Sequence, residues 1–130
     1  MRLLPDTSIW VDYLRTGRHG SAGELDDLLA EDSVFICGPV AAELLAGAAP
    51  DRRADLWIAL GGLPWAELDH EAFREVGHVA NDLRRRGDMV PLTDVMIAVA
   101  AARSDLSLWT RDGDFERIQG VLPALVLRSS

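Results

Sequence analysis

Short apolar runs alternate with segments of helical spacing along the chain, and this alternation restricts the fold more than any other feature of the sequence. The expected strands are residues 2–6, 33–37, 64–68, 106–110 and 122–127. The expected helices are residues 8–15, 21–31, 39–47, 51–62, 71–86 and 93–102. Strands that alternate with helices favour an α/β domain with a central, mainly parallel sheet.

Hydroxyl residues stand where two of these helices begin. Thr7 or Ser8 is expected to cap the first helix, and Thr93 the last, because a hydroxyl oxygen can accept a hydrogen bond from the free N–H groups of a first turn. With this assignment Asp94 lies in the first turn of the last helix. Glu43 lies in the middle of the helix at 39–47.

Length and hydropathy favour one ordinary domain. We expect a single domain over residues 1–130, because 130 residues are enough for one core. No apolar run approaches the roughly 18 residues of a membrane span. An acid as early as Asp6 leaves no room for an export signal, so the expected location is the cytoplasm. Cys37, the single cysteine, is expected to be a buried core residue.

The charge of the chain limits how it could bind nucleic acid. The formal net charge is −8, and the sequence contains no lysine. This balance argues against a broad phosphate-binding surface, so any nucleic-acid contact must be local. A phospho-acceptor receiver domain is also disfavoured, because such domains pair an aspartate with a lysine that this chain lacks.

Four acids fall where a parallel α/β sheet forms its sites. Asp6 follows the first expected strand, Asp112 follows the strand that ends at Thr110, and Asp94 opens the most apolar helix. Sites in such sheets form at the carboxyl ends of the strands, and Glu43 can join them because its helix follows the second strand. Carboxylates in one cleft repel one another unless a cation neutralises them. An all-oxygen set suits Mg²⁺ or Mn²⁺.

Four segments together resemble the PIN-domain ribonucleases, and among them the VapC toxins of type II toxin–antitoxin systems. These segments are DTSIW, AAELLAG, PLTDVMIAVAA and LWTRDGDFERI, in this order. The resemblance implies a three-layer α/β/α PIN-like domain and a metal-dependent endoribonuclease. It also implies metal-binding and catalytic roles for Asp6, Glu43, Asp94 and Asp112, with Mg²⁺ or Mn²⁺ as the cofactor.

The same resemblance assigns two supporting hydroxyls and leaves one ligand open. Ser8 and Thr110 match hydroxyl positions beside the acids, where they would support the metal site. Asp114 stands two residues after Asp112, and the spacing does not decide which of them faces the metal. The family pattern of threonine, any residue and an acid favours Asp112.

The resemblance implies hydrolysis of RNA by water activated at the metal, with Glu43 as the candidate to orient or deprotonate that water. Arg111, beside the last acid, is a candidate phosphate contact or a member of a surface ion pair. Arg84, Arg85 and Arg86 form the only basic run, which is either a solvated helix end or a phosphate-steering patch.

The implied partners are an RNA substrate, a second copy of the chain in a homodimer, and a small VapB-like antitoxin, with no membrane. Trp10, Val11 and Leu14 are candidate exposed apolar positions for the dimer or the antitoxin. A catalytically silent PIN-like interaction module and a metal-dependent DNA nuclease stay open as alternatives.

Overall fold

A short parallel sheet forms the centre of the molecule. The computed structural model describes residues 2–128. The strands are β1 (Leu3–Pro5), β2 (Ser107–Trp109) and β3 (Val126–Arg128), in the order β1-β2-β3 with both pairings parallel. Two isolated parallel bridges, Leu3 with Val34 and Ile36 with Trp65, extend the sheet beyond β1. The prediction of a mainly parallel sheet is therefore confirmed.

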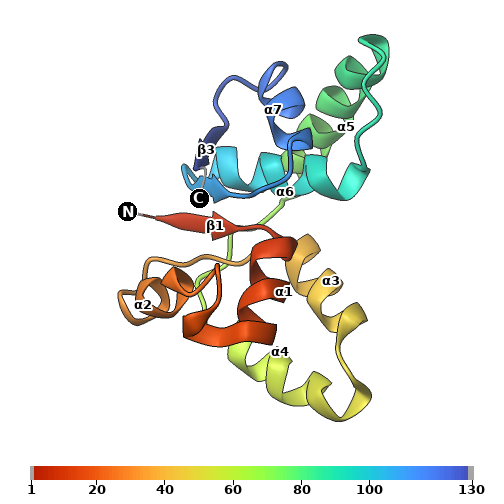
Figure 1. Ribbon diagram of the computed structural model, residues 1–130. Helices are drawn as coiled ribbons and strands as arrows, with labels where there is room; N and C mark the ends of the chain where they lie inside the picture. The colour runs from red at the N-terminus through yellow and green to blue at the C-terminus, as the bar shows by residue number, and fades with distance from the viewer. Residues whose placement is uncertain (1, 129–130) are drawn as a thin grey trace.

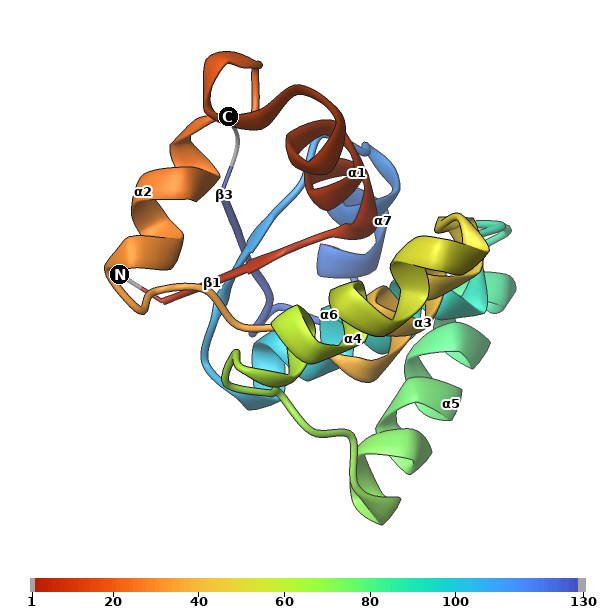
Figure 2. The same ribbon diagram turned by 90° about the horizontal axis from the view of Figure 1, so that it is seen from below.

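Helices cover both faces of this sheet, which confirms the three-layer α/β/α arrangement (Figure 1). The α-helices are α1 (Thr7–Thr16), α2 (Glu24–Ala30), α3 (Gly38–Gly47), α4 (Arg53–Gly61), α5 (His70–Arg85), α6 (Leu92–Arg103) and α7 (Asp114–Gln119). Two 3₁₀ turns, Gly17–His19 and Pro50–Arg52, precede α2 and α4. Helices α1 to α4 lie on one side of β1 and α5 to α7 on the other. Figure 2 shows β1 running directly into the start of α1.

The core lies between these layers and uses the residues that the pattern marked as apolar. Leu4 and Leu108 are register partners on the adjacent strands β1 and β2, and both are fully buried. Helix α6 is buried on most sides, as its almost uniformly apolar sequence predicts. Cys37 is also fully buried, and burial raises the pKa of its thiol to about 11. No helix formed by the described residues is long and apolar enough to cross a membrane.

Two local predictions about the helix starts and one about the surface were wrong. The first helix is capped by Asp6, not by Thr7 or Ser8, because the Asp6 carboxylate accepts from the Ile9 N–H at 3.1 Å. The last long helix begins one residue before Thr93, with Pro91 at its N-cap. Trp10 is only 4% exposed. It therefore belongs to the core, not to an exposed apolar surface.

Short elements account for the other differences. Residues 33–37 and 64–68 contribute isolated bridges instead of full strands. The last strand is Val126–Arg128, because residues 121–124 belong to the turn region that precedes it. Helix α7 is absent from the helices expected from the sequence, since six residues are too few to show a helical period. This helix matters because its first residue is Asp114.

Candidate metal centre

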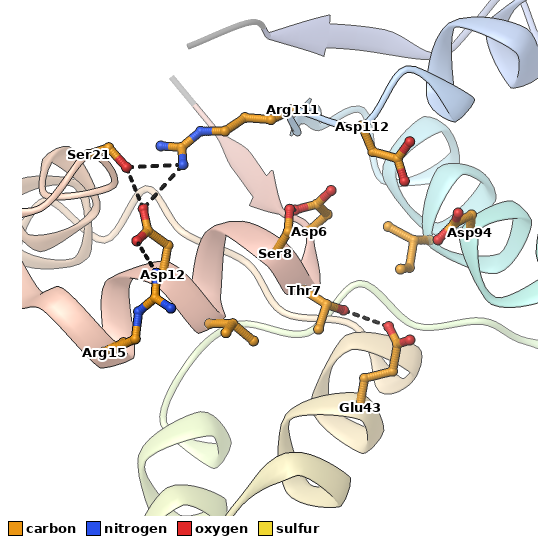
Figure 3. A pocket seen from close by; sticks show the side chains of 12 residues that line it. Asp6, Thr7, Ser8, Asp12, Arg15, Ser21, Glu43, Asp94, Arg111 and Asp112 are labelled. Carbon is orange, nitrogen blue, oxygen red and sulfur yellow. Dashed lines mark hydrogen bonds and ion pairs between the residues drawn. The ribbon is translucent and has the colours of Figure 1, made fainter.

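A cavity of about 620 Å³ lies at the carboxyl ends of β1 and β2 and collects the predicted acids (Figure 3). Asp6 reaches it from the end of β1, Glu43 from α3, Asp94 from the first turn of α6 and Asp112 from the segment after β2. The rule that placed these residues at one edge of the sheet thus brings all four of them to one cavity.

Asp6 is nearly fully buried, and its carboxylate is held by three hydrogen bonds. Its Oδ1 accepts from the Ser8 hydroxyl at 2.7 Å and from the Ile9 N–H at 3.1 Å. Its Oδ2 accepts from the Thr110 hydroxyl at 2.5 Å. A buried charge is costly unless it is hydrogen-bonded, and these donors meet that requirement. They also fix the direction in which the carboxylate faces the cavity.

Thr110 connects the ends of the two strands. Its hydroxyl donates to Asp6 and accepts from the Asp112 N–H at 3.0 Å. The Asp112 Oδ1 in turn accepts from the Asp114 N–H at 2.9 Å, at the start of α7. Both hydroxyls that the resemblance marked as supporting, Ser8 and Thr110, therefore contact Asp6 directly.

Three carboxylates approach closely enough to share an ion. One oxygen each from Asp94, Asp112 and Asp114 lies within 4.8 Å of the others. The pKa of Asp94 is raised to about 6, first by burial and then by repulsion from the surrounding carboxylates, those of Asp112 and Asp114 before those of Glu43 and Asp6. An all-oxygen set whose members repel one another fits a hard divalent cation such as Mg²⁺ or Mn²⁺. Asp112 and Asp114 both belong to this set, so the structure does not make them alternatives.

Glu43 stands on the opposite wall of the cavity. It is exposed on α3, and its Oε1 accepts from the Thr7 hydroxyl at 2.6 Å. Glu43 is close enough to raise the pKa of Asp94 but lies outside the group of three carboxylates. It lines the same cavity as Asp6, Asp94 and Asp112.

A second group of polar side chains, centred on Asp12, lines the same cavity and was missed by the sequence analysis. Asp12 accepts from the Ser21 hydroxyl at 2.5 Å and pairs with Arg111 at 3.1 Å and with Arg15 at 3.6 Å. The Ser21 hydrogen bond, followed by that of Arg111, lowers the pKa of Asp12. The one signal in the sequence is spacing, because Asp12 stands four residues after Ser8 on α1.

The basic run is not part of this cavity. Arg84 and Arg85 end α5, Arg86 follows them, and none of the three is among the lining residues. Arg86 pairs with Asp88 at 3.7 Å. Arg111 does line the cavity, so of the predicted arginines it alone is near the acids.

Comparisons with known proteins identify the class to which this fold and site belong. Residues 3–121 match the PIN domain. Ribonuclease VapC11 of Mycobacterium tuberculosis is 35% identical over 121 residues, which are 89% of this chain and 90% of that protein. A VapC ribonuclease of Mycobacterium bovis matches with the same identity and coverage. The chain therefore belongs to the PIN domain family.

Solved structures show the same fold. The DNA-bound VapBC of Salmonella typhimurium aligns with a TM-score of 0.80 at 23% identity, over 99% of this chain and 98% of that one. VapBC2 of Rickettsia felis, bound to a DNA fragment from its promoter, aligns with a TM-score of 0.77 at 24% identity, over 100% and 99% of the two chains. The arrangement of sheet and helices described above is thus that of PIN-fold proteins from toxin–antitoxin complexes.

Proposed function

We propose that this protein is an endoribonuclease that depends on Mg²⁺ or Mn²⁺ and acts as the toxin of a type II toxin–antitoxin pair. The observation that carries the proposal is the convergence of Asp94, Asp112 and Asp114 within 4.8 Å, at a cavity that Asp6 and Glu43 also line. The relatives named ribonuclease VapC support RNA as the substrate.

Each side chain has a separate task in this proposal. Asp6, Asp94 and Asp112 hold the cation, and Asp114 is close enough to share in this. A divalent cation bound there activates water and offsets the charge that develops on the phosphate oxygens. Glu43, steadied by Thr7, orients the attacking water and accepts its proton. Hydrolysis leaves a 5′-phosphate and a 3′-hydroxyl.

The hydroxyls and arginines complete the site. Ser8 and Thr110 keep the Asp6 carboxylate directed at the cavity. Arg111 contacts a phosphate of the substrate, because it is the predicted arginine that lines the cavity. The run at 84–86 lies elsewhere and attracts RNA at longer range in this proposal. A protein that acts on cellular RNA works in the cytoplasm, and our proposal includes that location.

An apolar groove beside the cavity supports an antitoxin as the partner. It encloses about 530 Å³ between α1, α3 and α4, and Val11, Leu14 and Leu56 are among the residues that line it. Val11, Arg15 and Glu43 line both the groove and the acidic cavity. A helix that packs its apolar face into the groove would extend a neighbouring segment over the acids. The solved VapBC complexes support such a partner.

One surface substitution tests whether the groove binds the antitoxin or forms the interface of the proposed homodimer. Light scattering of the purified protein gives its oligomeric state. Leu14→Asp places a charge in the groove, so it should prevent complex formation with a co-expressed antitoxin and leave RNA cleavage intact. If Leu14→Asp instead dissociates a dimer of the protein alone, the groove is the dimer interface.

The proposed activity is tested by incubating a panel of structured RNAs with purified protein in Mg²⁺, Mn²⁺ or EDTA. We expect cleavage with either metal, none in EDTA, and product ends that carry 5′-phosphate and 3′-hydroxyl groups. The product ends are a control, because contaminating nucleases that attack through the 2′-hydroxyl leave 2′,3′-cyclic phosphates. Asp6→Asn and Asp94→Asn should both abolish cleavage.

The same assay separates the two alternatives. Cleavage of single-stranded DNA in preference to RNA of the same sequence would identify a DNA nuclease. Failure to cleave either nucleic acid, together with no binding of Mg²⁺ or Mn²⁺, would identify a silent interaction module.

A further inference from the structure

The helix α1 carries polar groups from the acids to the far edge of the cavity. Ser8, Asp12 and Arg15 are spaced by four and three residues, so they lie on one face of the helix, and all three line the cavity. Ser8 contacts the acid Asp6. One turn further along, Asp12 forms ion pairs with Arg15 and Arg111.

Two arginines from different parts of the chain meet at the Asp12 carboxylate. The Arg111 Nη1 lies 3.1 Å from the Asp12 Oδ2 and 3.1 Å from the Ser21 hydroxyl. Arg15, from the next turn of α1, lies 3.6 Å from the Asp12 Oδ1. Figure 3 shows the Arg111 side chain running from the side of Asp112 towards Asp12 and Ser21. The group thus spans the cavity edge between α1 and the segment after β2.

The carboxylate of this group is less exposed than the two arginines around it. The Asp12 side chain is 15% exposed, whereas that of Arg111 is 37% exposed and that of Arg15 is 75% exposed. Two guanidinium groups around one carboxylate leave one net positive charge at this edge. Guanidinium groups bind phosphate through paired N–H donors. The Asp12 pKa is lowered, so the carboxylate stays ionised where the protein functions.

We propose that Asp12 is a positioning residue that holds Arg111 and Arg15 as a binding site for a phosphate next to the one that is cleaved. The inference rests on the proposed nuclease function. It adds that the substrate must supply a second phosphate, held beside the acids but away from their negative charge. The preferred substrate is therefore longer than a dinucleotide.

Paired variants test this site. Asp12→Asn and Arg111→Gln disrupt it, and the matched controls are Glu75→Gln and Arg103→Gln. The control pair, at 3.0 Å and with Arg103 39% exposed, resembles the Asp12–Arg111 pair but lies between α5 and α6. We expect Asp12→Asn and Arg111→Gln to raise KM about tenfold and to change kcat less than twofold, as the loss of a charge-assisted contact predicts. Both controls should match the wild type.

A second variant covers the case in which Asp12→Asn destabilises the protein. Arg15→Gln removes a mostly exposed side chain, and Arg74→Gln is its control, since Arg74 forms a similar pair with Glu71 on α5. We expect Arg15→Gln to raise KM with an unchanged melting temperature. Unchanged KM in both Arg15→Gln and Arg111→Gln would overturn the proposal, as would a fall in kcat at constant KM.

Binding assays with modified RNA keep this test independent of cleavage. Fluorescence anisotropy with Ca²⁺ measures the affinity for an RNA decamer and for the same decamer with a neutral methylphosphonate beside the central linkage. The neutral linkage should weaken binding to the wild type about tenfold and binding to Asp12→Asn much less. Equal weakening in the two proteins would overturn the phosphate site. If the wild type cleaves no RNA, the nuclease proposal fails, and this binding difference still decides whether the phosphate site exists.

Discussion

Two charged cavities in this molecule contain the same kinds of side chain in opposite arrangements. The second cavity, of about 520 Å³, lies between α5, the end of α6 and residues 121–124. Two of the acids that line it are paired with arginines, Glu71 with Arg74 at 3.1 Å and Glu75 with Arg103 at 3.0 Å. In the first cavity, within the described residues 2–128, Asp94 forms no ion pair and is crowded by other acids.

The pairing of the acids differs between the two cavities, and this difference indicates which of them binds a cation. The acids of the second cavity come from successive turns of α5, and their exposed pairs contribute little to stability. The acids of the first come from separate strands and helices, and bringing them together costs free energy because they repel one another. Of the three crowded carboxylates, Asp114 pairs with Arg117 at 3.4 Å. Asp94 and Asp112 form no ion pair within residues 2–128. Crowded carboxylates that arginines only partly neutralise indicate a cation that binds between them.

The largest expected effect comes from removing one of the crowded acids. Asp94→Asn or Asp6→Asn should lower the initial rate of RNA cleavage by about 100-fold or more, because each removes a ligand and a charge and not merely a group that orients a ligand. Asparagine stabilises a helix N-terminus about as strongly as aspartate does, so Asp6→Asn should leave α1 folded. The control is Asp69→Asn, since Asp69 caps α5 through the Ala72 N–H at 2.9 Å. Equal losses in Asp6→Asn and Asp69→Asn would show that Asp6 acts through helix capping and not through the acidic cavity.

The next effect concerns the hydroxyl that joins two of the acids. Thr110→Val removes the donor to Asp6 and the acceptor for the Asp112 N–H. We expect metal affinity to fall by about 10–100-fold and the free energy of unfolding to fall by about 1–3 kcal/mol. Calorimetric metal titration and urea unfolding measure these quantities. Thr110→Ser, which keeps the hydroxyl, should bind metal as the wild type does, and a loss of affinity in that variant would contradict the role of the hydrogen bonds.

A smaller effect follows from the pKa of Asp94, which is raised from 3.8 to about 6 in the folded protein. Uptake of a proton by this group stabilises the folded state at low pH, and that contribution is lost as the pH rises through about 6. A divalent cation offsets the repulsion at higher pH. The rise in melting temperature on adding Mn²⁺ should therefore be larger at about pH 7.5 than at about pH 5. Asp94→Asn should show little of this pH dependence, and an equal rise at both pH values in the wild type would contradict it.

The smallest effect is expected in the second cavity. Glu75→Gln breaks the pair with Arg103, and its effect on the free energy of unfolding should be within about 0.5 kcal/mol, because both side chains are partly exposed. Addition of Mn²⁺ should raise the melting temperature of this variant as much as that of the wild type. A reduced response to Mn²⁺ would show that the second cavity also binds the ion.

The parts of the site that follow strand ends were predictable from the sequence. Asp6 stands directly after an apolar run, Asp112 stands two residues after the expected strand that ends at Thr110, and the parallel sheet brings such positions to one edge. Their proximity depends on topology, which the alternation of strands and helices already specifies. The expectation of a cap at Thr7 or Ser8 was wrong because the carboxylate of Asp6 serves both the helix and the cavity.

The arginine group at the cavity edge was not predictable in the same way. Asp12 and Arg111 are 99 residues apart, and neither the helix period of α1 nor the turn after β2 indicates that they meet. The position of Asp114 was also hard to predict, since it depends on a helix of only six residues. Contacts of this kind are set by packing between elements and not by local pattern.

The most direct test of the metal centre is a calorimetric titration of Mn²⁺ into the wild type, Asp94→Asn and Glu75→Gln at about pH 7.5, where Asp94 is ionised. We predict that the wild type and Glu75→Gln bind the ion alike and that Asp94→Asn binds it at least about tenfold more weakly. No binding to the wild type, or equal binding to all three proteins, would contradict a cation site among the crowded acids.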